Sequence, residues 1–353
     1  MKCNIAIDVM GGDHGPEVTI PASMDVLKSH SQVNLTLVGD EQTIEKHLLG
    51  FSEQSDFNKI RQRINIVHST QVVAMDEKPS LALRGKKDSS MRVAINLVKN
   101  NQVNACVSAG NTGALMATAR FVLKMLPGIN RPAICSSLPT IKGHTHMLDL
   151  GANIDLSSQQ LFEFAAMGSV LSQAVDNLDR PSVGLLNIGE EEVKGNEQVK
   201  QAAKLISNSN LNYHGFIEGD DIYKGTVNVV VCDGFVGNIA LKTSEGVAKM
   251  ISYYLKQAYN RNIFTKLVAL LSLPILNSFK RKVDPGEYNG ASLLGLRGIV
   301  IKSHGSANRR SFAQAIREAV LEVDKNVPQL ISKQIEAFLE KSSSDNSSSD
   351  KKG

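Results

Sequence analysis

The stretch that decides the fold is VNACVSAGNTGALMATA, residues 103–119. Its apolar run Ala105-Cys106-Val107 leads through the polar turn at residues 108–113 into apolar residues at three- and four-residue spacing. That order predicts a buried strand, a tight glycine turn and a helix. Glycine lets the backbone approach a ligand closely, and the free N–H groups of a helix N-terminus favour an anion. A single turn of this kind is more often an ordinary connection than a binding site.

The chain repeats this arrangement of an apolar run followed by a polar turn that contains glycine. Such turns lie at residues 8–16, 108–114, 188–196 and 233–238. Strands that alternate with helices predict an α/β fold, a mainly parallel sheet covered by helices on both faces. Ligands of such sheets bind beyond the carboxyl ends of the strands. Four turns of this chemistry therefore indicate a shared anion pocket.

Composition places the chain in a broad class. With 353 residues, 42% of them hydrophobic and 21% charged, the chain is long enough for one large α/β unit, which we expect over residues 1–338. The Ser-, Asp- and Lys-rich stretch 341–353 lacks core residues, so we expect a disordered tail. A net charge of +4, 5% aromatic residues and no tryptophan argue against nucleic acid as a partner.

Cysteine usage and the N-terminus indicate the compartment. The four cysteines lie far apart and form no CxxC pair, which favours neither a disulfide framework nor a zinc site. The chain opens on a strand-like run at residues 3–7, without a basic segment and apolar signal, and no apolar run reaches membrane-spanning length. We therefore expect a cytoplasmic protein.

Residues 263–282 depart from the alternating pattern. They combine apolar residues with flanking cations at Lys266 and residues 280–282, and Pro274 predicts a split into two short helices or a helix and a turn. We expect a protruding helical segment at about 250–285. An exposed apolar tip beside cations is typical of peripheral contact with an anionic membrane, while a dimer surface and a buried hairpin are alternatives. The expected membrane residues are Leu267, Leu270, Leu271, Leu273 and Ile275.

Several catalytic fingerprints are absent from the sequence. Gly290 and Gly295 have the spacing that opens a P-loop, but Leu296 stands where lysine is required, so no nucleotide cofactor is indicated. His144 and His146 can in principle clasp a metal, but two histidines without a supporting cluster more often belong to a polar loop, so we expect no metal site.

Two cysteines and one lysine are the remaining candidates for reactive groups. Cys106 and Cys232 each end a strand, where a small apolar core residue is a commoner role than a nucleophile. Lys194 is the best candidate for steadying charge that develops during a reaction. The alternative for Lys194 is a solvated lysine neutralised by the acidic run 190–192.

Six motifs together resemble the bacterial phosphate acyltransferase family of phospholipid synthesis, in register from residue 1 to about 335. The motifs are IDVMGGDHGP (7–16), SAGNTGA (108–114), LDLGAN (148–153), LNIGEE with KGNE (186–191 and 194–197), DGFVGN (233–238) and GASLLG (290–295). The resemblance implies a fold similar to isocitrate and isopropylmalate dehydrogenases and to phosphotransacetylase. It also implies a homodimeric, peripheral membrane enzyme without a metal or nucleotide cofactor.

The activity implied by the resemblance is the conversion of acyl-acyl carrier protein and inorganic phosphate to acyl phosphate. The product feeds the glycerol-3-phosphate acyltransferase of the membrane, so the enzyme is expected at the inner face of the cell membrane. Lys194 and Asn238 match the positions linked to catalysis. The substrate-binding residues expected from the turns and motifs are Asp8, Gly11, Gly12, His14, Ser108, Gly110, Asn111, Thr112, Gly113, Asp149, Asn153, Asn196, Asp233, Gly237 and His304.

These residues suggest a mechanism without a covalent enzyme intermediate. Phosphate held near Asn111 and Thr112 attacks the thioester carbonyl, and Lys194 with Asn238 steadies the tetrahedral oxyanion or orients the phosphate. Acyl carrier proteins are acidic, so a basic docking surface is expected. Its candidates are Arg84, Lys86, Lys87 and Arg92, or Arg261 with residues 280–282. Two alternatives stay open: phosphotransacetylase-like chemistry on acyl-CoA, and a non-catalytic membrane scaffold.

Overall fold

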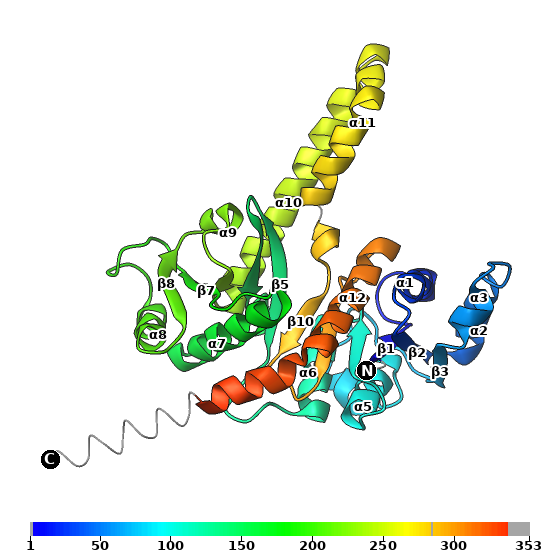
Figure 1. The fold of residues 1–353 in the computed structure, drawn as a ribbon, viewed down its shortest axis with the longest axis horizontal. Helices are drawn as coiled ribbons and strands as arrows, with labels where there is room; N and C mark the ends of the chain where they lie inside the picture. The colour runs from blue at the N-terminus through cyan, green and yellow to red at the C-terminus, as the bar shows by residue number, and fades with distance from the viewer. Residues whose placement is uncertain (1–2, 284, 338–353) are drawn as a thin grey trace.

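One mixed sheet runs through the protein (Figure 1). The computed structural model describes residues 3–283 and 285–337. The strands are β1 (Cys3–Asp8), β2 (Val33–Gly39), β3 (Ile64–His68), β4 (Ala105–Ser108), β5 (Ala133–Thr140), β6 (Gly143–Leu148), β7 (Ser182–Leu186), β8 (Asn212–Ile217), β9 (Val229–Val231), β10 (Ala291–Leu294) and β11 (Ile299–Lys302). Their order in the sheet is β3-β2-β1-β4-β11-β10-β5-β6-β9-β7-β8.

Most strand pairings are parallel. Among the strands that the structure describes, seven of the ten pairings run parallel, and the antiparallel ones are β11–β10, β10–β5 and β5–β6. The predicted mainly parallel α/β fold is therefore confirmed. The three antiparallel steps reverse the sheet, so the group β6, β9, β7 and β8 runs opposite to the group β1 to β4 with β11. The carboxyl ends of the two parallel groups consequently point to opposite edges of the sheet.

Helices cover both faces of the sheet. The helices are α1 (Pro16–Ser29), α2 (Glu41–Leu49), α3 (Phe57–Arg61), α4 (Pro79–Gly85), α5 (Ser90–Lys99), α6 (Thr112–Leu123), α7 (Ser158–Val175), α8 (Glu197–Ser207), α9 (Asp221–Lys224), α10 (Gly234–Tyr259), α11 (Ile263–Val283), the 3₁₀ turn η1 (Pro285–Tyr288) and α12 (Arg309–Lys325). Residues 327–337 are also helical.

Strand β1 shows how the sequence pattern builds two core layers. Ile5 and Ile7 belong to a buried cluster with residues of α1 and α12. The intervening Ala6 belongs to a second cluster with residues of α5 and α6 on the other face. Successive side chains of a strand point to opposite faces, so an unbroken apolar run is what a strand buried on both sides requires. A third cluster centres on Phe164 of α7 and the second group of parallel strands.

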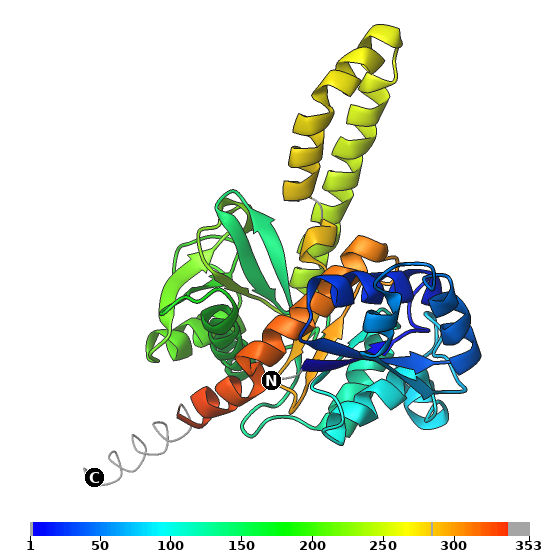
Figure 2. The same cartoon turned by 45° about the vertical axis from the view of Figure 1, so that its right-hand side comes forward.

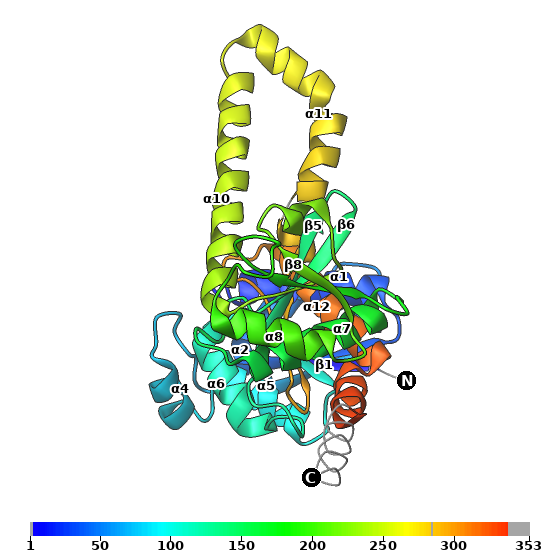
Figure 3. The ribbon, with the colours of Figure 1, turned by 90° about the vertical axis from the view of Figure 1, so that its left-hand side faces the viewer.

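Helices α10 and α11 form an arm that projects from the body (Figures 2 and 3). Of the described residues of α10, only Gly234 and Gly237 are buried. The apolar side chains of Leu270, Leu271 and Ile275 in α11 are 62%, 75% and 73% exposed. Nowhere in residues 3–283 and 285–337 does a helix have both the length and the hydropathy that a bilayer crossing requires.

Two local predictions are wrong. Pro274 does not split its segment, because α11 continues from Ile263 to Val283 with the proline inside; Figure 3 shows this helix bent. A proline removes one backbone hydrogen bond, and in an exposed helix water can satisfy the freed carbonyl, so the helix bends without ending. Residues 144–146 do not form a loop, because they lie in β6 between β5 and β9. The predicted tail at 341–353 lies outside the described residues.

Candidate functional site

Three buried residues fix the turns at the carboxyl ends of β1 and β4. Asp8 ends β1 and is 1% exposed, and its Oδ2 accepts a hydrogen bond of 2.6 Å from Ser108 Oγ. Ser108 Oγ in turn accepts the backbone N–H of Gly110 at 3.0 Å. A Cβ at Gly11 would stand 2.6 Å from Asp8 Oδ2 and 2.8 Å from Gly110 N. The two glycine turns therefore meet with no room for a side chain between them.

Lys302 adds a buried cation that the sequence did not reveal. It ends β11 beside β4 and is 8% exposed. Its Nζ donates to the carbonyl of Ala109 at 3.2 Å and to the carbonyl of Ser303. Burial lowers the pKa of Lys302 to about 8, although the carboxylate of Asp8 acts in the opposite direction. Its place in the site follows only from the pairing of β11 with β4, which puts Lys302 opposite Ser108.

Asn111 is the N-cap of α6 and does not present its side chain to a ligand. Its Oδ1 accepts the N–H of Ala114 at 2.9 Å. Its Nδ2 donates to the carbonyls of Met75 at 2.7 Å and Glu77 at 3.0 Å. Thr112 is exposed at the first turn of the helix. The N-terminus of α6 is thus anchored by Asn111, and its backbone N–H groups carry the positive end of the helix dipole.

A second group of the predicted residues meets where β6 and β9 end. Asp149 is fully buried, and its Oδ1 accepts the N–H of Ile134 at 2.9 Å. Its Oδ2 accepts from Asn153 through the backbone N–H at 2.6 Å and Nδ2 at 2.9 Å. Burial raises the pKa of Asp149, against these hydrogen bonds. Gly237 of α10 packs on this turn so closely that a Cβ there would lie 1.9 Å from the carbonyl oxygen of Asp149.

Helix α10 joins the two groups. Its Asn238 lies beside Gly151, where an added Cβ would lie 3.5 Å from Asn238 Cβ. Two and three residues further along α10, Ala240 and Leu241 pack on the second core cluster.

Lys242 of α10 lies near the first group of residues, at the ends of β1, β4 and β11. Burial is the largest cause of the lowered pKa of His304, and the charge of Lys242 on α10 lowers it further. Lys242 also lowers the pKa of Lys302. The N-terminal half of α10 therefore runs from the turn at Asp149 to the neighbourhood of Lys302, although the strands on the two sides end at opposite edges.

Lys194 lies in the exposed loop after β7 rather than against Asn238. Its Nζ pairs with Glu191 Oε1 at 3.1 Å, and its side chain is 46% exposed. Asn196 caps α8 by accepting the N–H of Val199 at 2.9 Å. Strand β7 neighbours β9 with Leu185 opposite Val231, so this loop borders the start of α10. Among the described residues, no hydrogen bond joins Lys194 to Asn238.

The remaining predicted residues have structural or exposed positions. Asp233 caps α10 by accepting the N–H of Val236 at 2.9 Å. His14 and His304 are exposed, and His304 Nδ1 lies 2.9 Å from Ser306 Oγ. Gly12 and Gly113 are packed against Ala109 and Pro79.

The two cysteines are not nucleophiles. Cys106 and Cys232 are buried, and burial raises the pKa of both thiols. A thiol whose pKa is raised by an apolar surrounding stays protonated and inert. The role that the sequence favoured for these residues, small members of the core, agrees with their places in the second cluster.

The sequence and the fold have known relatives. The chain matches the family model for the fatty acid synthesis protein over residues 3–330. It is 58% identical over 339 residues to a phosphate acyltransferase of Nitrosococcus oceani, covering 96% of this chain and 98% of that protein. It is 57% identical over 341 residues to a phosphate acyltransferase of Hydrogenovibrio crunogenus, covering 96% and 99%.

Solved structures show the same fold at low identity. A phosphotransacetylase from Streptococcus pyogenes matches with a TM-score of 0.60 and 18% identity over 94% of each chain. The EutD phosphotransacetylase from Staphylococcus aureus matches with a TM-score of 0.56 and 16% identity, covering 90% of this chain and 94% of that one.

Proposed function

The chain belongs to the fatty acid synthesis protein family of phosphate acyltransferases, and on that premise we propose that its substrates are long-chain acyl-acyl carrier protein and inorganic phosphate. An oxygen of phosphate attacks the thioester carbonyl carbon, the carbon–sulfur bond breaks, and the carrier leaves as a thiolate that takes up a proton. The product is acyl phosphate. Phosphate is itself a sufficient nucleophile in this step, so the reaction uses no acyl-enzyme.

The observation that carries this proposal is the convergence of positive groups at the start of α6. The N-terminus of that helix follows the turn that Asp8 and Ser108 fix, and Lys302 lies beside it on Ala109. Helix N-termini and cations together favour a phosphate ion. In this proposal Asp8, Ser108 and Gly110 position the turns, while the backbone N–H groups of Thr112 and Gly113 bind the anion, because those of Ala114 and Leu115 are already bonded to Asn111.

The oxyanion of the tetrahedral intermediate is assigned to the second group. Asn238 stands on the first turn of α10, held by the contact of Gly237 with Asp149. Lys194 approaches from the adjoining loop after its ion pair with Glu191 opens, a change that its 46% exposure permits. Fixed donors aimed at developing charge are commonly worth 10²- to 10³-fold in turnover.

The decisive experiment compares two acyl donors. The purified protein is incubated with labelled orthophosphate and either long-chain acyl-acyl carrier protein or acyl-CoA, and a hydroxylamine-sensitive labelled product is measured. We expect product mainly from the carrier protein. Product from acyl-CoA alone identifies the phosphotransacetylase-like alternative. No product from either donor contradicts the enzyme assignment and favours the membrane scaffold.

The docking surface proposed for the acidic carrier lies on α4, α5 and α6. Arg92 and Lys124 both stand over the exposed ring of Phe121, with Cζ and Nζ 5.3 and 5.0 Å from its centroid. Arg84 of α4 and Lys87 just after it are also exposed, and α4 packs on α6. Cations around an apolar anchor suit an acidic partner with a hydrophobic patch. Charge reversal at Arg92 and Lys124 should raise the KM for acyl-acyl carrier protein and leave that for acyl-CoA unchanged.

The second docking candidate, Arg261 with residues 280–282, falls partly outside the described side chains. The exposed apolar face of α11 is instead proposed as a peripheral contact with the anionic inner face of the cell membrane, where glycerol-3-phosphate acyltransferase consumes the product. Leu270→Asp with Leu271→Asp should abolish flotation with anionic vesicles. Intact flotation would contradict the membrane contact, and a loss of dimers in the same variant would assign this face to the homodimer.

A further inference from the structure

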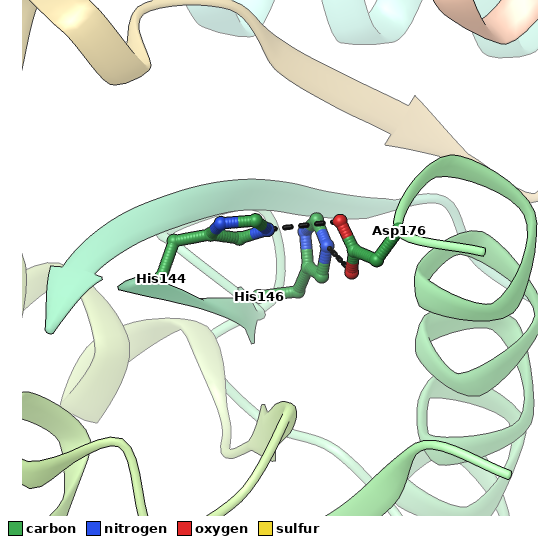
Figure 4. A group of neighbouring side chains, drawn as sticks. All are labelled: His144, His146 and Asp176. Atoms are coloured by element: carbon green, nitrogen blue, oxygen red, sulfur yellow. Dashed lines mark hydrogen bonds and ion pairs between the residues drawn. The ribbon is translucent and has the colours of Figure 1, made fainter. Parts of the chain in front are cut away.

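A cluster of two histidines and one aspartate lies between β6 and the end of α7 (Figure 4). His144 and His146 are two residues apart on β6, so their side chains leave the same face of the strand. Asp176 is the C-cap of α7, opposite that face. His144 Nε2 lies 2.9 Å from Asp176 Oδ1, and His146 Nε2 lies 2.8 Å from Asp176 Oδ2.

The geometry of the three side chains is that of a shared centre. One ligand atom from each of the three residues lies within 4.8 Å of the other two. The imidazole rings meet nearly at right angles, with an interplanar angle of 83° and centroids 5.1 Å apart, so the nitrogens approach Asp176 from different directions. Two nitrogens and a carboxylate can approach so closely only with protons or a metal ion between them.

Neighbouring groups orient the cluster. His146 Nδ1 lies 3.2 Å from Ser137 Oγ, and Ser172 Oγ donates to Asp176 Oδ2 at 2.8 Å. A partner on the far ring nitrogen fixes which nitrogen faces the centre, as the second shell of metal sites does. Glu318 of α12 lies within electrostatic range of His144, His146 and Asp176.

The cluster is open to solvent on one side only. The His144 side chain is 37% exposed, which leaves a path from solvent, whereas His146 is 3% exposed.

We propose that His144, His146 and Asp176 bind a zinc-like divalent cation. Two imidazole nitrogens with one carboxylate are ligands that Zn²⁺ accepts in tetrahedral sites, with a fourth position left for water or another side chain. Mg²⁺ and Ca²⁺ prefer shells made of oxygen atoms, so this set of donors selects against them. The bound ion would clamp β6 to the end of α7 and thereby stabilise the second half of the sheet.

The test uses zinc alone and the whole protein. After dialysis against EDTA and removal of the chelator, we expect calorimetric titration with ZnCl₂ to show one equivalent per chain, with a Kd below about 1 μM. At a hundredfold excess over the Kd, zinc should raise Tm by about 4 °C, and MgCl₂ should leave it unchanged.

Matched variants separate the cluster from other histidines. His144→Asn, chosen because the side chain is half-exposed, and Asp176→Asn should each weaken zinc binding at least 100-fold. His214→Asn, at an exposed position on β8, should bind zinc as the unaltered protein does. If Asp176→Asn fails to fold, His144→Asn still gives the answer.

Two results overturn the proposal. The first is an unaltered, folded protein that takes up no zinc in this titration. The second is His144→Asn binding zinc with the affinity of His214→Asn. Either outcome reduces the cluster to a hydrogen-bond network that joins β6 to α7.

Discussion

Gly237→Ala should lower both stability and turnover by forcing apart one close contact. The new Cβ would lie 1.9 Å from the carbonyl oxygen of Asp149 and 3.0 Å from Cys232 Sγ. Carbon and oxygen need roughly 3 Å, so the first turn of α10 must move by about 1 Å. Neither neighbour is the free end of a flexible side chain. Overpacking of this kind costs about 1–3 kcal/mol in the free energy of unfolding, and a displacement of about 1 Å at Asn238 lowers kcat by roughly 100-fold.

Gly246→Ala on the same helix is the matched control. Nothing lies within 4 Å of the Cβ that alanine would add at Gly246, so the replacement should stabilise the helix by up to about 1 kcal/mol. The two variants are compared by urea denaturation and by the rate of acyl phosphate formation. Equal stability and equal turnover in both would refute the reasoning that packing on Asp149 positions Asn238.

Three further perturbations test charges. Lys194→Ala should lower turnover by about 100-fold without changing the urea midpoint, because the exposed side chain pairs only with Glu191 in the described structure; near-normal turnover in this variant removes Lys194 from the mechanism. The KM for phosphate should rise as the pH passes about 8, where Lys302 loses its proton. In Lys302→Met, the KM for phosphate should be high at every pH and should not change near pH 8. Burial raises the pKa of Glu322 from 4.5 to about 8, so its contribution to stability is full below pH 4.5 and is lost as pH rises to about 8. Glu322→Gln should flatten the fall in Tm over that window; an unchanged fall would assign it to other groups.

Local sequence signals predicted elements that local interactions define. Helix α2 begins at Glu41 because Asp40 accepts the N–H of Thr43 at 2.9 Å. Helix α7 follows a capping box between Ser157 and Gln160. Strands such as β3 follow from short apolar runs bounded by polar residues. In each case the information lies within a few neighbouring residues.

Features that depend on pairing between distant segments were missed. The polar sequence at residues 144–146 becomes a strand only because β5 and β9 pair with it on both sides. Thr145 is consequently fully buried, with its hydroxyl bonded to the carbonyl of Val227 at 2.9 Å. The third member of the histidine cluster, Asp176, lies 30 residues beyond His146 and no sequence spacing relates them. Lys302 was not among the predicted site residues, because the sequence alone does not show that a lysine is buried.

The rule that ligands bind beyond the carboxyl ends of parallel strands does not by itself predict a single site in this sheet. Because the antiparallel strands β10 and β5 reverse the sheet, that rule sends the turn at Asp8 and the turn at Asp149 to opposite edges. Helix α10 spans this separation, because it starts on the turn at Asp149 and brings Lys242 within electrostatic range of Lys302. Asn238 and Lys242 are four residues apart, or about 6 Å along the helix axis. A shift at Gly237 should therefore displace Asn238 and Lys242 together. Two independent sites would not respond together in this way.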